Sequence, residues 1–315
     1  MKIQCAESFS RILVVITCSL ALLLPGCSQS VNKRIPSAAT AAGLAGLPEE
    51  PNENSILNKS AEELLASGYA YLSMQNPGLA RMHFAAALEK DPTLSEAYVG
   101  LGTIEQKSGN ISGAIRFFTK AAESDPSNIT PLIKLSQALR QDSKLDQAEK
   151  SILKATEMAP DDLQVLAERA ILHDQRGTPE LAEPIYHQIL ERDPKRADII
   201  NNLGVNYMLR EQYDDAIATF RQALQLNRSN SRIKNNLAAA YALSGDEQNA
   251  LRVFTGTIGK AQAYNNLGYL YMTAGRLDDA ERVLNKAIEL NPRFYTRAQE
   301  NLDRVLWMES GSLPE

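Results

Sequence analysis

A pattern that recurs about every 34 residues constrains this chain more than any other feature of its sequence. It is clearest in Ala197 to Asn230, where apolar residues fall at helical spacing in two halves separated by a short turn. A search at fixed offset finds seven copies, which begin at residues 61, 95, 129, 163, 197, 231 and 261. The pattern therefore predicts an all-α fold of seven helical hairpins.

Three positions of the repeated unit predict how its two helices pack. The twentieth residue is alanine in every copy, the eighth is always small, and the twenty-fourth is always large and apolar or aromatic. Small residues let two helix axes approach closely, and the large residue fills the space beyond them. Proline follows the second helix at Pro92, Pro126, Pro160, Pro194 and Pro292, and glycine stands in the turn at Gly109, Gly177, Gly245 and Gly275.

These positions resemble the tetratricopeptide repeat, or TPR, over residues 61–294. The resemblance implies a right-handed superhelix in which the first helices of the hairpins line a concave groove. The sixth unit, residues 231–260, has only 30 residues, and we expect its second helix to lack about one turn. Residues 295–309 continue a helical pattern and are expected to cap the last repeat. Residues 310–315 are expected to be disordered.

The N-terminus, residues 1–26, is typical of a targeting signal, because two basic residues precede an apolar run too short to span a bilayer. The sequence Leu24-Pro25-Gly26-Cys27 resembles the bacterial lipobox. This resemblance implies cleavage before Cys27, acylation of that cysteine and, with Ser28 next, a place on the outer membrane facing the periplasm. An ordinary cleaved signal and an uncleaved anchor are the alternatives. Residues 27–59 shift to small and polar residues and prolines, which is typical of a flexible tether.

The composition argues against several classes of function. The chain has 33 basic and 38 acidic residues, so it lacks the basic character that binding to nucleic acid requires. It contains no glycine-rich phosphate loop, nucleophile elbow or HExxH motif. Its three histidines are spaced for packing or solvent contact rather than for a metal. We therefore expect no catalytic residue, metal, cofactor or small-molecule substrate.

Pairs of asparagine recur on the first helices of the last three repeats and form the candidate peptide-binding surface. They are Asn201 and Asn202, Asn235 and Asn236, and Asn265 and Asn266. Asparagine is a poor helix former, so its repetition needs a reason. An amide offers a donor and an acceptor, which suits a peptide backbone. The second residues of the pairs resemble the amide ladder in the TPR domain of O-GlcNAc transferase, with Tyr269 and Met208 as apolar anchors beside it.

A less specific interpretation of the same residues stays open. The amides can satisfy neighbouring polar groups, and the apolar residues beside them, including Tyr269 and Met208, can pack against adjacent helices.

Lipobox, tether and TPR array together resemble the lipoproteins of the tight adherence (Flp) pilus assembly system. That resemblance implies a non-catalytic adaptor that holds an extended segment of a protein partner, such as a secretin or another pilus component. One alternative is an outer-membrane lipoprotein that regulates a cell-wall synthase or another envelope complex. A periplasmic carbohydrate-active enzyme or peptidase is a further alternative, which would need a catalytic pair in the groove.

Overall fold

The computed structural model describes residues 58–291 and 295–310, which form fifteen helices and no strand. The first helices of the hairpins are α3 (Ala61–Ser73), α5 (Ser95–Lys107), α7 (Ile129–Gln141), α9 (Leu163–Gln175), α11 (Ala197–Leu209), α13 (Ser231–Leu243) and α15 (Lys260–Thr273). The second helices are α4 (Pro77–Lys90), α6 (Ile111–Ser124), α8 (Leu145–Met158), α10 (Pro179–Arg192), α12 (Tyr213–Leu226), α14 (Glu247–Ile258) and α16 (Leu277–Leu290). A final helix, α17 (Tyr295–Ser310), follows them. The all-α fold of sequential hairpins is confirmed.

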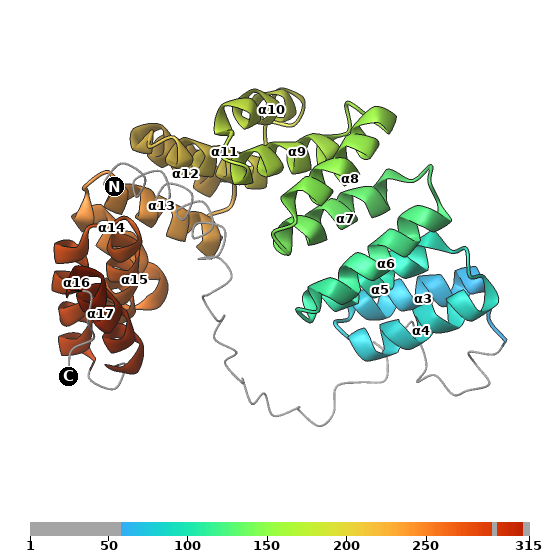
Figure 1. Ribbon diagram of the computed structural model, residues 1–315, viewed down its shortest axis with the longest axis horizontal. Helices are drawn as coiled ribbons and strands as arrows, with labels where there is room; N and C mark the ends of the chain where they lie inside the picture. Colours follow the sequence, from blue (N-terminus) through green and yellow to red (C-terminus); the bar gives the residue numbers. More distant parts are fainter. Residues whose placement is uncertain (1–57, 292–294, 311–315) are drawn as a thin grey trace, which may run out of the picture. The chain divides into compact units, whose positions relative to one another are not determined.

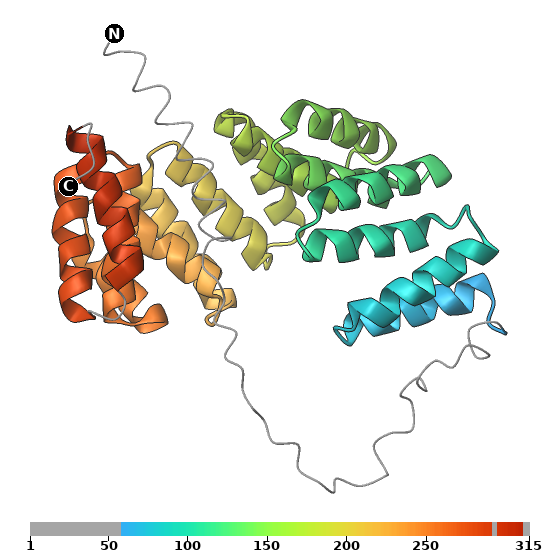
Figure 2. The same cartoon turned by 60° about the horizontal axis from the view of Figure 1, so that its bottom comes forward.

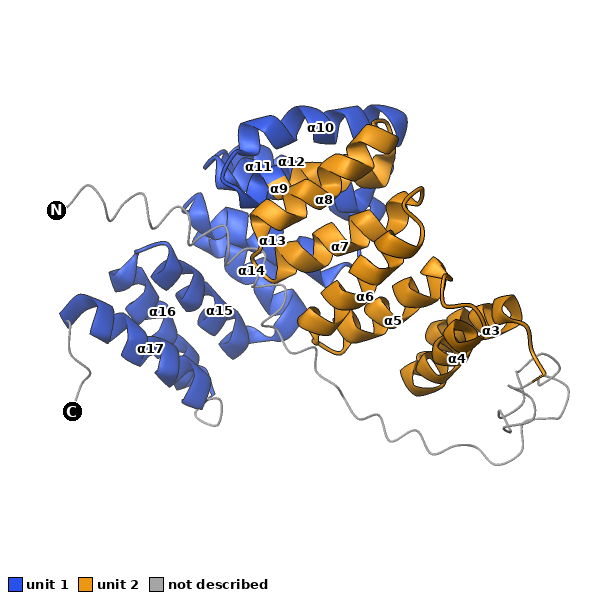
Figure 3. Cartoon of the chain, turned by 45° about the vertical axis from the view of Figure 1, so that its right-hand side comes forward, with its two compact units in different colours: residues 1–26, 173–315 blue, residues 27–172 orange. Residues whose placement is uncertain are grey.

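In the hairpins that lie within one unit, the two helices lie side by side and antiparallel, and the hairpins follow one another along the chain (Figures 1 and 2). The chain divides into two compact units, which Figure 3 shows in different colours. We call the described residues 58–172 the N-terminal unit, and residues 173–291 with 295–310 the C-terminal unit. The expected signal, the cysteine expected to be acylated (Cys27), all of the expected tether before residue 58 and the tail after Ser310 lie outside the described residues.

The hairpins close because small and large residues meet at fixed positions. The repeated alanines and their large partners are all buried, and Ala216 and Phe220 have no exposed surface. A Cβ atom added to Gly204 would lie 2.6 Å from the Phe220 ring, and one added to Gly102 would lie 2.5 Å from the Phe118 ring. These approaches are shorter than van der Waals contact, so only glycine lets the first helix come this close to the ring.

The turn inside each hairpin uses one residue with a left-handed backbone. It is glycine in four repeats, at Gly109, Gly177, Gly245 and Gly275, as the sequence predicts. In the other three repeats the same position is occupied by Gln75, Ser143 and Glu211, whose φ angles are 58°, 59° and 59°. The hairpin therefore imposes the left-handed backbone conformation at this position, even on residues whose side chains make that conformation unfavourable.

The sixth hairpin is short mainly in its connection to the seventh. Helix α14 has 12 residues, two fewer than the 14 of the other second helices, so the expected loss of about one turn was too large. A single residue, Gly259, joins α14 to α15, whereas four residues join the other hairpins of the array. Gly259 ends one helix and begins the next with φ of 88°, a conformation that glycine adopts without strain.

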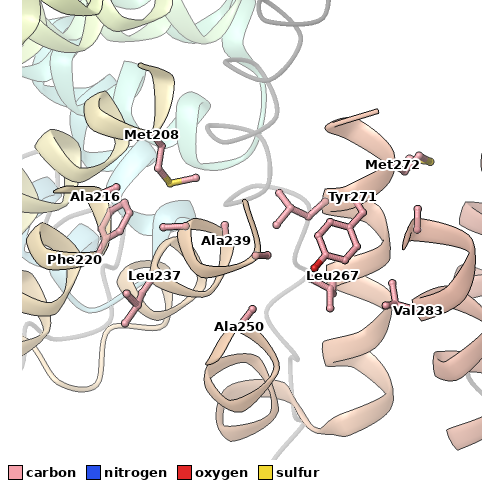
Figure 4. Packing of buried hydrophobic residues seen from close by; sticks show 14 of the residues in the cluster. Met208, Ala216, Phe220, Leu237, Ala239, Ala250, Leu267, Tyr271, Met272 and Val283 are labelled. Atoms are coloured by element: carbon pink, nitrogen blue, oxygen red, sulfur yellow. The ribbon is translucent and has the colours of Figure 1, made fainter. Parts of the chain in front are cut away.

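Each unit has its own buried core. In the C-terminal unit one apolar cluster runs from Ile200 on α11 to Val305 on α17. Figure 4 shows part of this cluster, including Met208, Phe220 and Val283. Leu302 and Val305 belong to this cluster, so α17 covers the last hairpin in the way expected of a capping helix. In the N-terminal unit separate clusters surround Phe84, Phe118 and Ile152.

Candidate functional site

The six asparagines of the candidate surface lie on α11, α13 and α15, which are the first helices of three successive hairpins. They do not have equal access to solvent. Asn201 and Asn265 are each only 4% exposed. The other four are half-buried, and they are Asn202, Asn235, Asn236 and Asn266. The two members of a pair therefore have different environments, although they are neighbours in the sequence.

In two of the three pairs the first asparagine links its helix to the next first helix or to the final helix, α17. The Asn236 Nδ2 group donates to Asn201 Oδ1 at 2.9 Å, which joins α13 to α11. The Asn301 Nδ2 group on α17 donates in the same way to Asn265 Oδ1 on α15, at 3.1 Å. These buried amides hold successive helices in register, in agreement with the less specific interpretation of the pairs.

The corresponding link between α13 and α15 is missing. By analogy, Asn266 would donate to Asn235, but the Asn235 Oδ1 atom is buried without a hydrogen-bond partner in the described residues. The short connection through Gly259 lies between these two helices along the chain. We attribute the lost link to the change of register that this connection introduces.

Amide groups remain available for a ligand on the second members of the pairs. Asn201 and Asn265 donate to Asn202 and Asn266 at 3.5 and 3.4 Å. Among the described hydrogen bonds, none uses the Nδ2 group of Asn202 or of Asn266, or the Oδ1 atom of Asn236. Three successive helices therefore present a donor, an acceptor and a donor on half-buried side chains.

The two apolar candidates differ. Tyr269 is half-buried at the edge of the apolar cluster, and it remains a candidate anchor. Met208 is 2% exposed and lies with Ala216 and Phe220 in the core (Figure 4). The prediction that Met208 offers an anchor to a ligand is wrong, because its side chain fills the space between hairpins.

A buried polar network in the C-terminal unit, which was not predicted from the sequence, is centred on Asp174 of α9. Tyr186 donates its hydroxyl to Asp174 Oδ2 at 2.6 Å, and Asn206 donates its amide to Asp174 Oδ1 at 2.6 Å. Burial raises the pKa of Asp174 to about 7, while the two hydrogen bonds act in the opposite direction. The only signal in the sequence was a polar residue, Asn206, on an otherwise apolar helix face.

Polar groups of the N-terminal unit are joined in a different way. Arg140 on α7 donates from Nε to Glu168 Oε1 on α9 at 3.0 Å, and Ser136 donates to the same oxygen at 3.0 Å. Glu168 is 2% exposed, so this ion pair is nearly enclosed. Arg140 is therefore occupied by its own chain and does not offer a free cation to a ligand.

Two further properties of the described residues concern membranes and metals. No helix within residues 58–291 or 295–310 combines the length and apolar character that a bilayer span needs. The same residues contain no group of three histidine, cysteine, aspartate or glutamate side chains placed to share a metal ion.

Several solved structures share the fold of this chain. A tetratricopeptide repeat protein from Parabacteroides merdae is similar with a TM-score of 0.57 and 20% identity, over 78% of this chain and 98% of that one. The human IFIT1 dimer with m7Gppp-AAAA gives a TM-score of 0.60 and 17% identity, over 80% of this chain and 64% of the other. The APC/C hetero-tetramer Cut9–Hcn1 gives a TM-score of 0.55 and 18% identity, over 80% of this chain and 54% of the other. At these identities the likeness concerns the fold alone.

A search of curated proteins found no match. Two profiles, both described as the tetratricopeptide repeat, match the sequence itself. One matches residues 197–230 and 261–294, and the other matches residues 65–129 and 133–197. The short sixth unit, residues 231–260, lies outside these matches. Since the matched residues make up more than half of the chain and follow its hairpins, the chain belongs to the tetratricopeptide repeat family.

Proposed function

We propose that this chain is a non-catalytic adaptor that holds an extended segment of a protein partner against α11, α13 and α15. Tetratricopeptide repeat arrays are generally scaffolds for protein–protein interaction and are not enzymes. The observation that carries the proposal is the row of unfilled amide groups on Asn202, Asn236 and Asn266. Amide donors and acceptors match the polar groups of a peptide backbone and are indifferent to its side chains.

The geometry sets the length and strength of this interaction. Adjacent packed helices lie about 8–10 Å apart, and an extended chain advances about 3.3 Å per residue, so one amide serves about three residues of the partner. Each hydrogen bond contributes about 0.5–1.5 kcal/mol net, and ordering the bound segment opposes binding. We expect a dissociation constant of about micromolar or weaker from the amides alone.

We also propose that the array is anchored to the outer membrane through acylated Cys27 and serves the assembly of a pilus or secretin. The support is the lipobox-like sequence Leu24 to Cys27 and its combination with the repeat array. Replacing Cys27 by alanine is expected to move the protein from the membrane fraction to the soluble fraction and to abolish labelling by a palmitate analogue. Unchanged labelling and fractionation would contradict the anchor.

The partner proposal is tested by crosslinking in cells that contain the lipidated protein, followed by capture and mass spectrometry. The wild type is compared with the triple variant of Asn202, Asn236 and Asn266 to alanine. A double variant of Asn202 and Asn266 to alanine removes the two unfilled donors, together with the oxygens that accept from Asn201 and Asn265, and keeps the link between Asn236 and Asn201. The control is Asn285→Ala, an exposed asparagine on α16.

The possible results separate the parts of the proposal. Capture of a secretin by the wild type and by the control, but not by the two amide variants, supports both the pilus role and the amide surface. Capture of a cell-wall synthase would keep the adaptor and replace the pilus role. Capture that is equal in all variants would exclude the amide surface. Substrate turnover by the purified protein, lost on one substitution, would instead establish an enzyme.

A further inference from the structure

A basic groove lies across α12, α13 and α14 in the C-terminal unit, away from the amide surface. It has a volume of about 350 Å³, and its lining residues are Arg221, Leu224, Gln225, Arg228, Leu237, Tyr241, Arg252 and Val253. On α13, Leu237 and Tyr241 lie about 100° and 140° around the helix from Asn236, at about 100° per residue. The groove therefore occupies a different face of this helix from the amides.

The charge of the groove is opposite to that of the chain as a whole. The chain carries 38 acidic and 33 basic residues, yet no acidic residue occurs between Asp215 and Asp246. That stretch contains four basic residues, which are Arg221, Arg228, Arg232 and Lys234. No acidic side chain lines the groove. Asp246, the N-cap residue of α14, interacts electrostatically with Arg252, whereas no lining residue neutralises Arg221 or Arg228.

The arginines of the groove form no ion pair with a carboxylate among the described residues. Arg221, Arg228 and Arg252 take part in none of the ion pairs found among the described residues, whereas Arg210, Arg276 and Arg282 of the same unit each do. Arg252 donates one bond to the amide oxygen of Asn249 at 2.6 Å, which leaves its other N–H groups available. Guanidinium groups bind carboxylates through two parallel hydrogen bonds, so unfilled arginines favour an acidic ligand.

The arginines of the groove border an apolar floor. Arg221 lies on α12, and Arg228 lies in the turn between this helix and α13. Leu224 lies between them, and Leu237 and Val253 continue the apolar floor from the two other helices. A segment with acidic side chains on both sides of an apolar residue therefore matches the chemistry of the groove.

We propose that this groove binds an acidic, extended segment of a protein partner, with its carboxylates on Arg221 and Arg228 and an apolar side chain on the floor. An apolar floor bordered by arginines suits the mixed side chains of a peptide segment. An overall acidic chain with a small basic patch is unfavourable for nucleic acid. The site is separate from the amide surface, so one chain is able to hold two segments.

The experiment measures fluorescence anisotropy of a labelled peptide of about ten residues, which carries two glutamates three residues apart and a leucine between them. The full chain is used, purified in a mild detergent. Arg221→Gln and Arg228→Gln are each expected to weaken binding about five- to tenfold, because hydrogen bonds to charged groups are strong. Salt raised from about 0.05 M to about 0.5 M is expected to weaken binding further.

Matched controls make the result specific. Arg232→Gln removes the same charge from the same basic stretch, at an exposed residue outside the groove, and is expected to leave binding within about twofold. The variant with Asn202 and Asn266 changed to alanine is expected to bind the peptide normally, since those amides lie on the other surface. A peptide with glutamine in place of both glutamates is expected not to bind.

Three results would overturn the proposal. Equal weakening by Arg232→Gln and Arg228→Gln would indicate general electrostatic attraction and not a groove. Equal binding of the glutamine peptide would remove the role of the carboxylates. Stronger binding to a single-stranded RNA or to vesicles with phosphatidylglycerol, lost in the same Arg221 and Arg228 variants, would identify the ligand as nucleic acid or lipid.

Discussion

The two units of the chain join successive first helices with different polar chemistry. In the N-terminal unit, α7 and α9 are held by the buried ion pair of Arg140 with Glu168. In the C-terminal unit, α11 and α13 are held by neutral amides, with Asn236 donating to Asn201. The scaffold is the same in both places, since each link joins the first helix of one hairpin to that of the next.

This difference determines which unit has groups left for a ligand. A buried carboxylate needs its cation, so Arg140 is committed to Glu168 and the junction is closed. An amide has a donor and an acceptor, so Asn236 links the helices through its nitrogen and keeps its oxygen available. The charged junction therefore has its groups paired, whereas the neutral junction keeps the amide groups on which the proposed binding depends.

The largest effect is expected when the charged junction is broken. Arg140→Ala leaves Glu168 buried without its cation, and we expect it to lower the free energy of unfolding by about 3–5 kcal/mol. Urea denaturation followed by circular dichroism measures the change. Arg116→Ala, at an exposed arginine on α6, is the control and is expected to change stability by less than about 0.5 kcal/mol. A loss for Arg140→Ala no greater than this control would show that the ion pair does not hold the junction.

A second, smaller effect concerns Asp174, whose buried carboxyl group accepts hydrogen bonds from two neutral side chains. Burial raises its pKa from 3.8 to about 7, against the effect of the hydrogen bonds from Tyr186 and Asn206. The pKa of Asp174 is higher in the folded chain than in the unfolded chain. Its neutral form therefore contributes fully to stability below about pH 4, and this contribution is lost as the pH rises through about 7. Through the ionisation of Asp174, the wild type is expected to lose about 2–3 kcal/mol of its free energy of unfolding between about pH 5 and pH 8. We expect the Asp174→Asn variant not to show this loss.

Thermal unfolding at several pH values compares the wild type with Asp174→Asn and with Asp278→Asn, a change at an exposed aspartate on α16. The wild type and the Asp278 control are expected to lose stability in parallel over this range, while the Asp174 variant loses less. Three parallel curves would show that Asp174 ionises at the same pH in the folded and unfolded chain.

The smallest effects distinguish the intact amide link from the missing one. Asn201→Ala removes the acceptor of Asn236, and we expect a loss of about 1 kcal/mol in the free energy of unfolding. Asn235→Ala removes a buried oxygen that has no partner, so we expect little change or a small gain. Chemical denaturation of both variants under one condition measures the difference. Equal losses would mean that Asn235 makes a bond in solution and that the sixth hairpin keeps the register of the others.

The hairpins follow directly from residues that the sequence repeats. Ala216 and Phe220 predict close packing of α11 on α12, and the structure places both with no exposed surface. Gly204 predicts the close approach, and its backbone lies against the Phe220 ring. These relations are local, because a hairpin packs mainly on itself, and so the sequence pattern is sufficient to predict them.

The candidate site was predictable only as a region. The sequence placed the asparagine pairs on one face of three helices, but it did not distinguish Asn201, which links helices, from Asn202, which keeps an unfilled donor. Met208 was expected at the surface and is buried. Both outcomes depend on how far each helix is rotated about its axis toward the next hairpin. The local sequence pattern does not predict that rotation.

By itself the sequence determined the helical class, the positions of the hairpins and the family, because those properties depend on spacing along the chain. Tertiary structure alone decided which polar groups are paired and which remain free. Within the described residues, Glu168 pairs with a cation, Asp174 does not, and Arg221 and Arg228 form no ion pair with a carboxylate. The physical reason is that a hydrogen bond or ion pair between hairpins needs an approach of about 3 Å across residues distant in sequence, and only packing sets that distance.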